Sequence, residues 1–390
     1  MTSSAAPLKP RPEPNRVPGS ARGQPQTHRA PCVSVLIVDD SLTVRTALKR
    51  MVESDPMLIV TGTASSAETA LAQIRQSAPD VVLLDLEMPG MGGLKALPAI
   101  LELAPHSAVL VVSALTEEGA QATLAALAMG AADTMLKPRP GEFTEDYRSA
   151  LVTRIRALGR GEPALAGEAV HLPLQPAKAL PASPPPMAAV PLGRPDIIAI
   201  GASTGGIHAL GQLLGQWPAS FAVPILITQH LPASFMTVFA RQIETMCNRP
   251  ARLADNGLVI TPGSITLASG EGHLTLRQVG DQIVTEICTR PQPSGCRPSV
   301  DPMLESVAAI YGSRALAIIL SGMGSDGLAG ARQLVASGGA VIAQDAASSA
   351  VWGMPGVVTR AGLARLVAPP QALGQAVLAS LSSTPRKGRP

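Results

Sequence analysis

Short aliphatic runs recur along the first half of the chain, and segments with the apolar spacing of amphipathic helices lie between them. Helix-like spacing is clearest over residues 42–53 and 67–76. The aliphatic runs are Val33–Val38, Leu58–Val60, Val81–Leu84, Ala108–Val112 and Thr134–Leu136. Continuous aliphatic strands are typical of parallel sheets that are covered on both faces. The alternation therefore predicts a doubly wound α/β domain over residues 33–157.

A second α/β domain is predicted over residues 195–382, where aliphatic runs resume. These runs are Ile197–Ile200, Pro224–Ile227, Ala315–Leu320 and Ala340–Ala343. Between the two domains, residues 158–194 are rich in Pro and Ala, which indicates a semi-rigid, extended linker. Residues 1–32 lack periodicity and are predicted to be disordered, and residues 383–390 are predicted to form a frayed tail.

Composition narrows the class of protein. The 390 residues are 46% hydrophobic but only 2% aromatic, so Ala, Val, Leu and Ile must build the cores. The net charge of +3 is spread without a basic stripe, which disfavours nucleic-acid binding. No apolar stretch is long enough to predict membrane insertion, and no secretory signal begins the chain, so we expect a cytoplasmic protein. The cysteines lack zinc-finger or redox spacing and are expected to be free thiols.

Acidic residues follow two of the predicted strands of the first domain. Asp39 and Asp40 come directly after one aliphatic run, and Asp85 follows another. Because the carboxyl ends of parallel strands meet at one edge, these carboxylates predict a site for Mg²⁺, which prefers oxygen ligands. Ser113 and Lys137 follow the next two runs and supply a hydroxyl and a cation for a phosphoryl group. Capping of the following helix would be a sufficient explanation for a single Asp at a strand end. It does not explain why carboxylates, a hydroxyl and a lysine follow four strands in this order.

This arrangement resembles the receiver domain of response regulators, and the stretch Leu84–Met91 is particularly like family examples. The resemblance implies that Asp85 accepts a phosphoryl group from a histidine kinase, and that Ser113 and Lys137 sense it. The implied Mg²⁺ ligands are Asp39, Asp40, Asp85 and the Glu87 carbonyl. Thr134 departs from the family pattern, because receivers often carry an aromatic switch residue three positions before the lysine.

A serine lies in a glycine-flanked turn after the first aliphatic run of the second domain. The segment GASTGG at residues 201–206 precedes a helix-like stretch over residues 207–214. Small neighbours allow a sharp turn that exposes the Ser203 hydroxyl, and the helix N-terminus favours developing negative charge. Two other interpretations remain open at this point. One is a phosphate- or dinucleotide-binding turn, whose glycine spacing differs, and the other is an ordinary tight crossover.

A histidine and an aspartate follow two other predicted strands of the same domain. His230 comes shortly after the run that ends at residue 227, and Asp326 follows the run that ends at residue 320. Together with Ser203 they predict a catalytic triad at one sheet edge. The chain order Ser-His-Asp differs from the order in α/β-hydrolases, so the match to G-x-S-x-G does not place the domain among them.

Five separated segments of the second domain resemble the chemotaxis-type protein-glutamate methylesterase family (CheB). They are GASTGG at 201–206, QHLP at 229–232, RPSVD at 297–301, SGMGSDG at 321–327 and AVWGMP at 350–355. An N-terminal receiver is the same family's architecture. The resemblance implies a flavodoxin-like receiver joined to a Rossmann-like methylesterase domain. It also implies a phosphorylation-activated serine hydrolase that removes methyl groups from glutamate γ-methyl esters of chemoreceptors, with some members deamidating receptor glutamines.

The implied mechanism assigns a role to each site residue. Ser203 attacks the ester carbonyl, His230 takes the serine proton, and Asp326 orients the imidazole. The resemblance implies that the Met323 N–H binds the oxyanion, and geometry also allows the N–H of Thr204. No cofactor is needed for this ester hydrolysis. Arg297, Ser299 and Asp301 also lie in a family-like segment. A surface ion pair or a helix cap would account for their presence as well as a role in the site.

A receiver on a linker can rest over the catalytic cleft, and phosphorylation of Asp85 is expected to shift that interdomain equilibrium. A DNA-binding output is disfavoured, because no basic recognition helix follows the linker. A phosphorylation-gated adaptor without catalysis and a hydrolase of small-molecule esters remain alternatives. The sequence gives no signal for the particular receptor or kinase.

Overall fold

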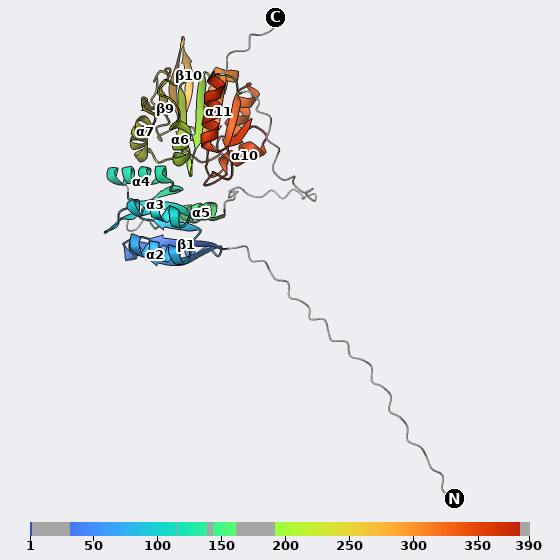
Figure 1. Cartoon of the computed structure of the whole chain (residues 1–390). Helices are drawn as coiled ribbons and strands as arrows, with labels where there is room; N and C mark the ends of the chain where they lie inside the picture. Colours follow the sequence, from blue (N-terminus) through green and yellow to red (C-terminus); the bar gives the residue numbers. More distant parts are fainter. Residues whose placement is uncertain (2–31, 115, 139–142, 161–191, 383–390) are drawn as a thin grey trace. The chain divides into compact units, whose positions relative to one another are not determined.

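The computed structural model describes residue 1 and residues 32–114, 116–138, 143–160 and 192–382, whose helices and strands are drawn in Figure 1. The predictions for residues 2–31, for most of the linker and for the tail therefore lie outside the described residues. From residue 32 onward the described residues belong to one compact unit. None of the described helices is long and apolar enough to cross a membrane.

The first sheet contains five parallel strands in the order β2-β1-β3-β4-β5. The strands are β1 Val33–Val38, β2 Leu58–Ala64, β3 Val81–Leu84, β4 Ala108–Ser113 and β5 Asp133–Leu136. The helices are α1 Leu42–Glu53, α2 Ala67–Gln76, α3 Gly93–Leu103, α4 Glu117–Met129 and α5 Glu145–Arg160. The strand order reverses between β1 and β3, so the crevice of this sheet lies at the carboxyl ends of those two strands.

Alternating side chains of each strand face two different cores. In β1, Leu36 and Val38 join the apolar cluster that also contains residues of α2, α3 and α4. Val35 and Ile37 face the other way and pack with residues of α1 and α5. This two-residue period explains why a strand buried on both faces reads as an unbroken aliphatic run. The predicted doubly wound architecture of the first domain is confirmed.

The second sheet contains seven parallel strands in the order β14-β13-β12-β6-β7-β9-β8. The strands are β6 Ile197–Ala202, β7 Ile225–Gln229, β8 Ala251–Leu253, β9 Ile265–Leu267, β12 Ala315–Ile319, β13 Ala340–Gln344 and β14 Leu366–Ala368. The helices are α6 Gly206–Leu214, α7 Ala233–Cys247, α8 Val300–Tyr311, α9 Leu328–Ala336, α10 Met354–Arg360 and α11 Pro370–Ser382, with the 3-10 turn η1 Gly312–Arg314. The predicted doubly wound class of this domain is also confirmed.

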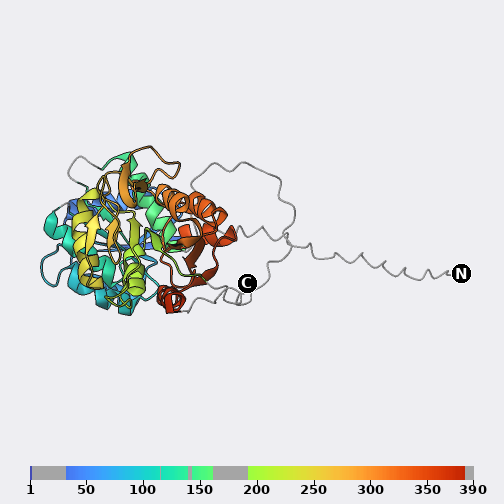
Figure 2. The same ribbon diagram turned by 90° about the horizontal axis from the view of Figure 1, so that it is seen from above.

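Helices cover both faces of the second sheet, as Figure 2 shows from above. Side chains of α6, α7 and α11 pack in one cluster with one set of strand residues. Side chains of α8, α9 and α10 pack with the alternate set. The chain leaves β6 toward β7 on one side and adds β12 on the other, so the order reverses beside β6. The binding crevice is therefore expected at the carboxyl ends of β6 and β12.

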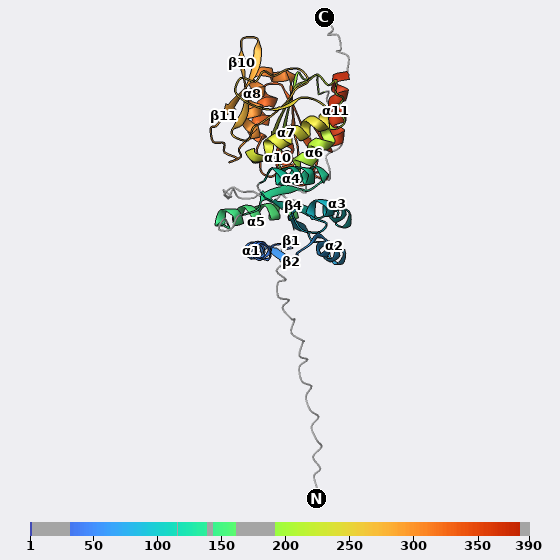
Figure 3. The same cartoon turned by 90° about the vertical axis from the view of Figure 1, so that its left-hand side faces the viewer.

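Several elements differ from the sequence-based predictions. The antiparallel hairpin of β10 (His273–Val279) and β11 (Gln282–Cys288) stands apart from both parallel sheets, and Figure 3 shows it beside α8. Helix α5 runs to Arg160, three residues beyond the predicted domain end. Ser113 is the last residue of β4 rather than a residue after it. These shifts leave the predicted sheet edges in place.

Candidate active site

Ser203 lies in the sharp turn between β6 and α6, where glycines allow close approach. Gly205 adopts a φ of +77°, a region that glycine reaches without strain. A Cβ at this position would lie 2.7 Å from both the Cβ of Ala350 and the Oγ of Ser321. Gly322 packs directly against the Ser203 turn. A Cβ added at Gly322 would lie only 2.8 Å from the Cβ of Ser203. Gly205 and Gly322 thus let the turns of two separate segments meet around Ser203.

Two buried polar side chains hold this turn in place. The Ser203 N–H donates to the Ser321 carbonyl at 3.0 Å, and the Ser321 hydroxyl donates to the Thr204 carbonyl at 2.7 Å. From the other side, Gln229 Nε2 donates to the Ser203 carbonyl at 2.9 Å. Sequence reasoning missed Ser321 and Gln229 as site residues. The only available signal was their place inside two of the family-like segments.

His230 and Asp326 form a direct contact. His230 follows β7, and its backbone N–H donates to the Ala202 carbonyl at 3.0 Å, next to the nucleophile turn. The imidazole Nε2 lies 2.8 Å from Asp326 Oδ2. Among the described residues, no hydrogen bond joins this ring to the Ser203 hydroxyl. Catalytic hydrogen bonds in unliganded enzymes are often loose and tighten when substrate binds.

The carboxylate of Asp326 is fixed by a set of donors. Its side chain is only 2% exposed, at the carboxyl end of β12. Ser299 Oγ donates to Oδ1 at 2.7 Å, and the Val300 N–H donates to Oδ2 at 2.7 Å. These bonds stabilise the charged form and orient it toward His230. Ser299, for which the sequence left a helix cap and a site role open, thus contacts the site.

The electrostatics of the pair favour an ion pair. Burial lowers the pKa of His230, but the hydrogen bonds that its ring makes to Asp326 and Cys296, together with the charges of those groups, outweigh this effect and raise the pKa well above 6.5. Burial raises the pKa of Asp326, but His230 and the donors at Ser299 and Val300 hold it below its usual range. The imidazole is therefore held protonated to higher pH than a free histidine.

Two backbone N–H groups beside Ser203 are available to a ligand. Within the described part of the chain, neither the Thr204 N–H nor the Met323 N–H has a hydrogen-bond acceptor. Thr204 directly follows Ser203, and Met323 directly follows Gly322, which packs against Ser203. The geometry therefore leaves both predicted oxyanion donors free, as a site for developing negative charge requires.

The other residues of the RPSVD segment have structural partners. Arg297 Nη2 donates to the Thr289 carbonyl at 3.2 Å. Asp301 Oδ1 accepts the Gly330 N–H at 2.8 Å and so links α8 to α9. Burial, together with the nearby charge of Asp326, raises the pKa of Asp301 to about 6. For these two residues the structure gives contacts within the fold rather than toward Ser203.

The acidic site of the first domain assembles at the β1/β3 edge. Carboxylate oxygens of Asp39, Asp40 and Asp85 lie within 4.8 Å of one another, a donor set that fits a hard divalent cation. Lys137 Nζ lies 2.8 Å from Asp39 Oδ2 and 2.7 Å from Asp85 Oδ2. Burial raises the pKa of Asp85 despite this lysine. The Glu87 side chain is exposed, and its N–H donates to Asp85 Oδ1 at 3.0 Å.

Ser113 and Thr134 do not contact these carboxylates. The Ser113 hydroxyl accepts a hydrogen bond from Thr123 Oγ1 of α4 at 2.6 Å. Thr134 is 8% exposed, and its hydroxyl has no hydrogen-bond partner among the described residues. It lines a cavity of about 520 Å³ with Tyr147 of α5, whose buried hydroxyl also has no partner in that part of the chain. An aromatic ring thus lies beside the position where the receiver pattern would place one.

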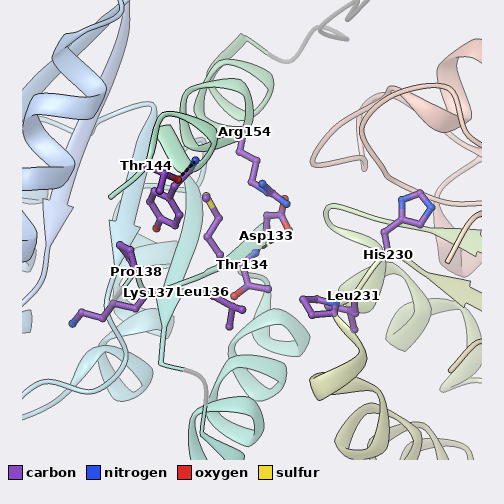
Figure 4. A pocket seen from close by; sticks show the side chains of 12 residues that line it. Asp133, Thr134, Leu136, Lys137, Pro138, Thr144, Arg154, His230 and Leu231 are labelled. Carbon is purple, nitrogen blue, oxygen red and sulfur yellow. Dashed lines mark hydrogen bonds and ion pairs between the residues drawn. The ribbon is translucent and has the colours of Figure 1, made fainter. Parts of the chain in front are cut away.

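This cavity also touches the second domain. Its lining includes residues of β5 and α5 together with the segment 230–232. Figure 4 shows Leu231 facing the cavity, whereas the imidazole of His230 points away from it. Close by, the Gly205 N–H donates to the Ala132 carbonyl at 2.6 Å, and Thr204 Oγ1 donates to Asp133 Oδ2 at 2.8 Å. Residues at the start of β5 therefore contact the nucleophile turn directly.

Comparison with known proteins finds two family models, one over each of the two domains. Residues 35–147 match the response regulator receiver domain model, and residues 198–377 match the CheB methylesterase model. A "protein-glutamate methylesterase/protein-glutamine glutaminase 1" from Paramagnetospirillum magneticum is 43% identical over 86% of this chain and 93% of its own length. The protein of the same name from Rhodospirillum rubrum is 40% identical over 89% and 95%.

A solved structure of the Thermotoga maritima CheB methylesterase catalytic domain is 33% identical, covers 48% of this chain and 98% of its own, and has a TM-score of 0.46. The match to the two curated relatives extends over 93% and 95% of their own lengths. The chain therefore belongs to the family of protein-glutamate methylesterases/protein-glutamine glutaminases that carry a response regulator receiver domain.

Proposed function

We propose that Ser203 is the nucleophile of a phosphorylation-controlled methylesterase that acts on glutamate γ-methyl esters of chemoreceptors in the cytoplasm. The observation that carries this proposal is the 2.8 Å contact between His230 and the buried Asp326 carboxylate, at the sheet edge where the Ser203 turn lies. A histidine kinase would supply the phosphoryl group. Because the relatives are also named protein-glutamine glutaminases, we further propose that the enzyme deamidates receptor glutamines.

The proposed reaction proceeds in two steps. Ser203 Oγ attacks the ester carbonyl, and its proton moves to His230 while Asp326 stabilises the imidazolium. The negative oxygen of the tetrahedral intermediate accepts hydrogen bonds from the free N–H groups of Thr204 and Met323. The C–O bond to methanol breaks as His230 returns the proton. Water, deprotonated by His230, then attacks the acyl-serine and releases free glutamate.

The receiver site would control this reaction. Asp85 is the proposed phosphoryl acceptor, and Asp39, Asp40 and the Glu87 carbonyl would join it in holding Mg²⁺. When bound, Mg²⁺ would neutralise charge on the phosphoryl oxygens. Phosphorylation of Asp85 would draw Lys137 to the phosphoryl group, away from its present contacts with the two aspartates. Ser113, hydrogen-bonded to Thr123, would couple the site to α4.

The nucleophile assignment is tested with Ser203→Ala. Methanol release from methylated receptor should fall by at least about 10⁴-fold, because the covalent step is lost. Receptor binding and Asp85 phosphorylation should persist in the variant. Retention of full methanol release would refute the assignment. Ammonia release from receptor glutamines, measured in the same samples, tests whether one serine serves both reactions.

A further inference from the structure

A cysteine that ester hydrolysis does not use lies beside the proposed catalytic pair. Cys296 belongs to the loop between β11 and α8. Its Sγ, a ring nitrogen of His230 and a carboxylate oxygen of Asp326 all lie within 4.8 Å of one another. Thiolate, imidazole and carboxylate are the three side-chain ligands with which proteins bind Zn²⁺. No sequence pattern predicted this cluster, because its members lie far apart in the chain.

The loop that carries the thiol is anchored on both sides of it. The Cys296 N–H donates to Ser294 Oγ at 3.3 Å, and its thiol contacts the Ser294 carbonyl at 3.7 Å. Arg297 donates to the Thr289 carbonyl at 3.2 Å. The Ser299 N–H donates to His273 Nδ1 at 2.9 Å. These contacts hold the loop that places the thiol beside His230 and Asp326.

The carboxylate of the cluster already has the outer contacts that a metal ligand needs. Ser299 Oγ and the Val300 N–H orient Asp326, as described above. Hydrogen bonds of this kind fix the direction of a ligating carboxylate and commonly strengthen metal binding. Cys296 and His230 are partly exposed, so an ion can reach them from solvent. The cluster thus combines two accessible ligands with one buried, oriented carboxylate.

We propose that His230, Cys296 and Asp326 bind a zinc-class divalent cation, and that its binding inhibits the hydrolase. The ion would replace the proton between His230 Nε2 and Asp326 Oδ2, which are 2.8 Å apart. Bonds of about 2.0 Å in tetrahedral geometry require these atoms to separate to about 3.3 Å. An imidazole bound to a dication cannot accept the serine proton. The inhibition, unlike the binding, rests on the proposed role of His230 as the base.

Binding is tested on the full-length protein with Co²⁺ alone as the spectroscopic probe. A cobalt–thiolate bond gives charge-transfer absorption in the near ultraviolet, which Co²⁺ at the carboxylates of the receiver site cannot give. We expect this band in the wild type at one equivalent, and its loss in Cys296→Ser. Cys288→Ser is the matched control, because Cys288 lies near the same loop but its thiol contacts Arg290 instead. Absence of the band in the wild type would contradict the proposal.

Inhibition is tested by titrating Zn²⁺ into the methanol-release assay and then adding a chelator. Each variant is compared with its own zinc-free rate. Loss of a single hydrogen bond to a metal ligand commonly lowers metal affinity by about 10- to 100-fold. Loss of the sulfur ligand itself should therefore raise the half-inhibiting Zn²⁺ concentration at least about tenfold. Cys288→Ser should behave as the wild type. Equal Zn²⁺ sensitivity of Cys296→Ser and the wild type would overturn the proposal.

The Ser203→Ala variant separates this inference from the proposed function. Its serine is not a ligand in the cluster, so the cobalt band should remain while methanol release is lost. If the band is missing but Ser203→Ala still abolishes methanol release, the metal site is wrong and the hydrolase stands. If Ser203→Ala keeps full methanol release, the proposed function fails whatever the cobalt spectra show.

Discussion

The imidazole of His230 is the side chain whose chemistry depends most on its neighbours. Beside Asp326 and Cys296, it has a pKa raised above the ordinary 6.5, although its partial removal from water acts in the opposite direction. A general base must be neutral to accept a proton. The charged form that the pair stabilises is therefore the inactive form for the first step of the proposed reaction.

This shift predicts the pH dependence of the enzyme. Because the raised pKa keeps His230 protonated to higher pH, kcat/KM for methanol release should fall as pH decreases, with a midpoint clearly above 6.5. The measurement is initial rate against pH at low substrate, with Ser203→Ala recording spontaneous ester hydrolysis. A midpoint at or below 6.5 would show that the ion pair does not hold in the working enzyme.

Individual site residues were predictable where they follow a strand directly. Asp39 and Asp85 lie at adjacent strand ends because a parallel sheet aligns its carboxyl edges. The same rule brought His230 and Asp326 together. Cys296 could not be found in this way, because it lies in a loop after a hairpin. Loop geometry depends on contacts such as the one between Ser299 and His273, which no local pattern encodes.

At the scale of the elements, the turn after β12 that contains Gly322 is expected to set the position of Ser203. Gly322 lies against the backbone and Cβ of Ser203, so Gly322→Ala should displace the serine. A shift of about 1 Å can cost roughly 100-fold, and we expect kcat to fall by that order. The comparison is with Gly211→Ala on α6, where the added methyl meets only the Met246 sulfur at 3.6 Å. Equal kcat values for both variants would contradict the close-packing argument.

The strands that were not predicted from the sequence are short or largely polar. β8, β9 and β14 have three residues each, too few for a hydrophobic period to stand out from its surroundings. The hairpin β10–β11 pairs residues such as Leu274 with Ile287, but polar residues occupy much of its length. By contrast, β6, β7, β12 and β13 are buried throughout and were evident as aliphatic runs.

At the scale of the whole chain, the proposed control is expected to act through the contact between the receiver and the Ser203 turn. Asp133 accepts a hydrogen bond from Thr204, beside the proposed oxyanion donors. Asp133→Ala removes this contact and should raise methanol release without a phosphodonor by about 5- to 10-fold, the equivalent of one hydrogen bond. Asp146→Ala, on the exposed side of α5, is the control. An unchanged basal rate in Asp133→Ala would mean that this contact does not restrain the enzyme.

The most direct test of the whole account measures methanol release from methylated receptor by the full chain, with and without a small-molecule phosphodonor and Mg²⁺. The wild type should accelerate when the phosphodonor is added. Asp85→Asn should keep the slow basal rate under both conditions, because it cannot be phosphorylated. Acceleration of Asp85→Asn equal to that of the wild type, or no acceleration of the wild type, would contradict a hydrolase controlled through this receiver.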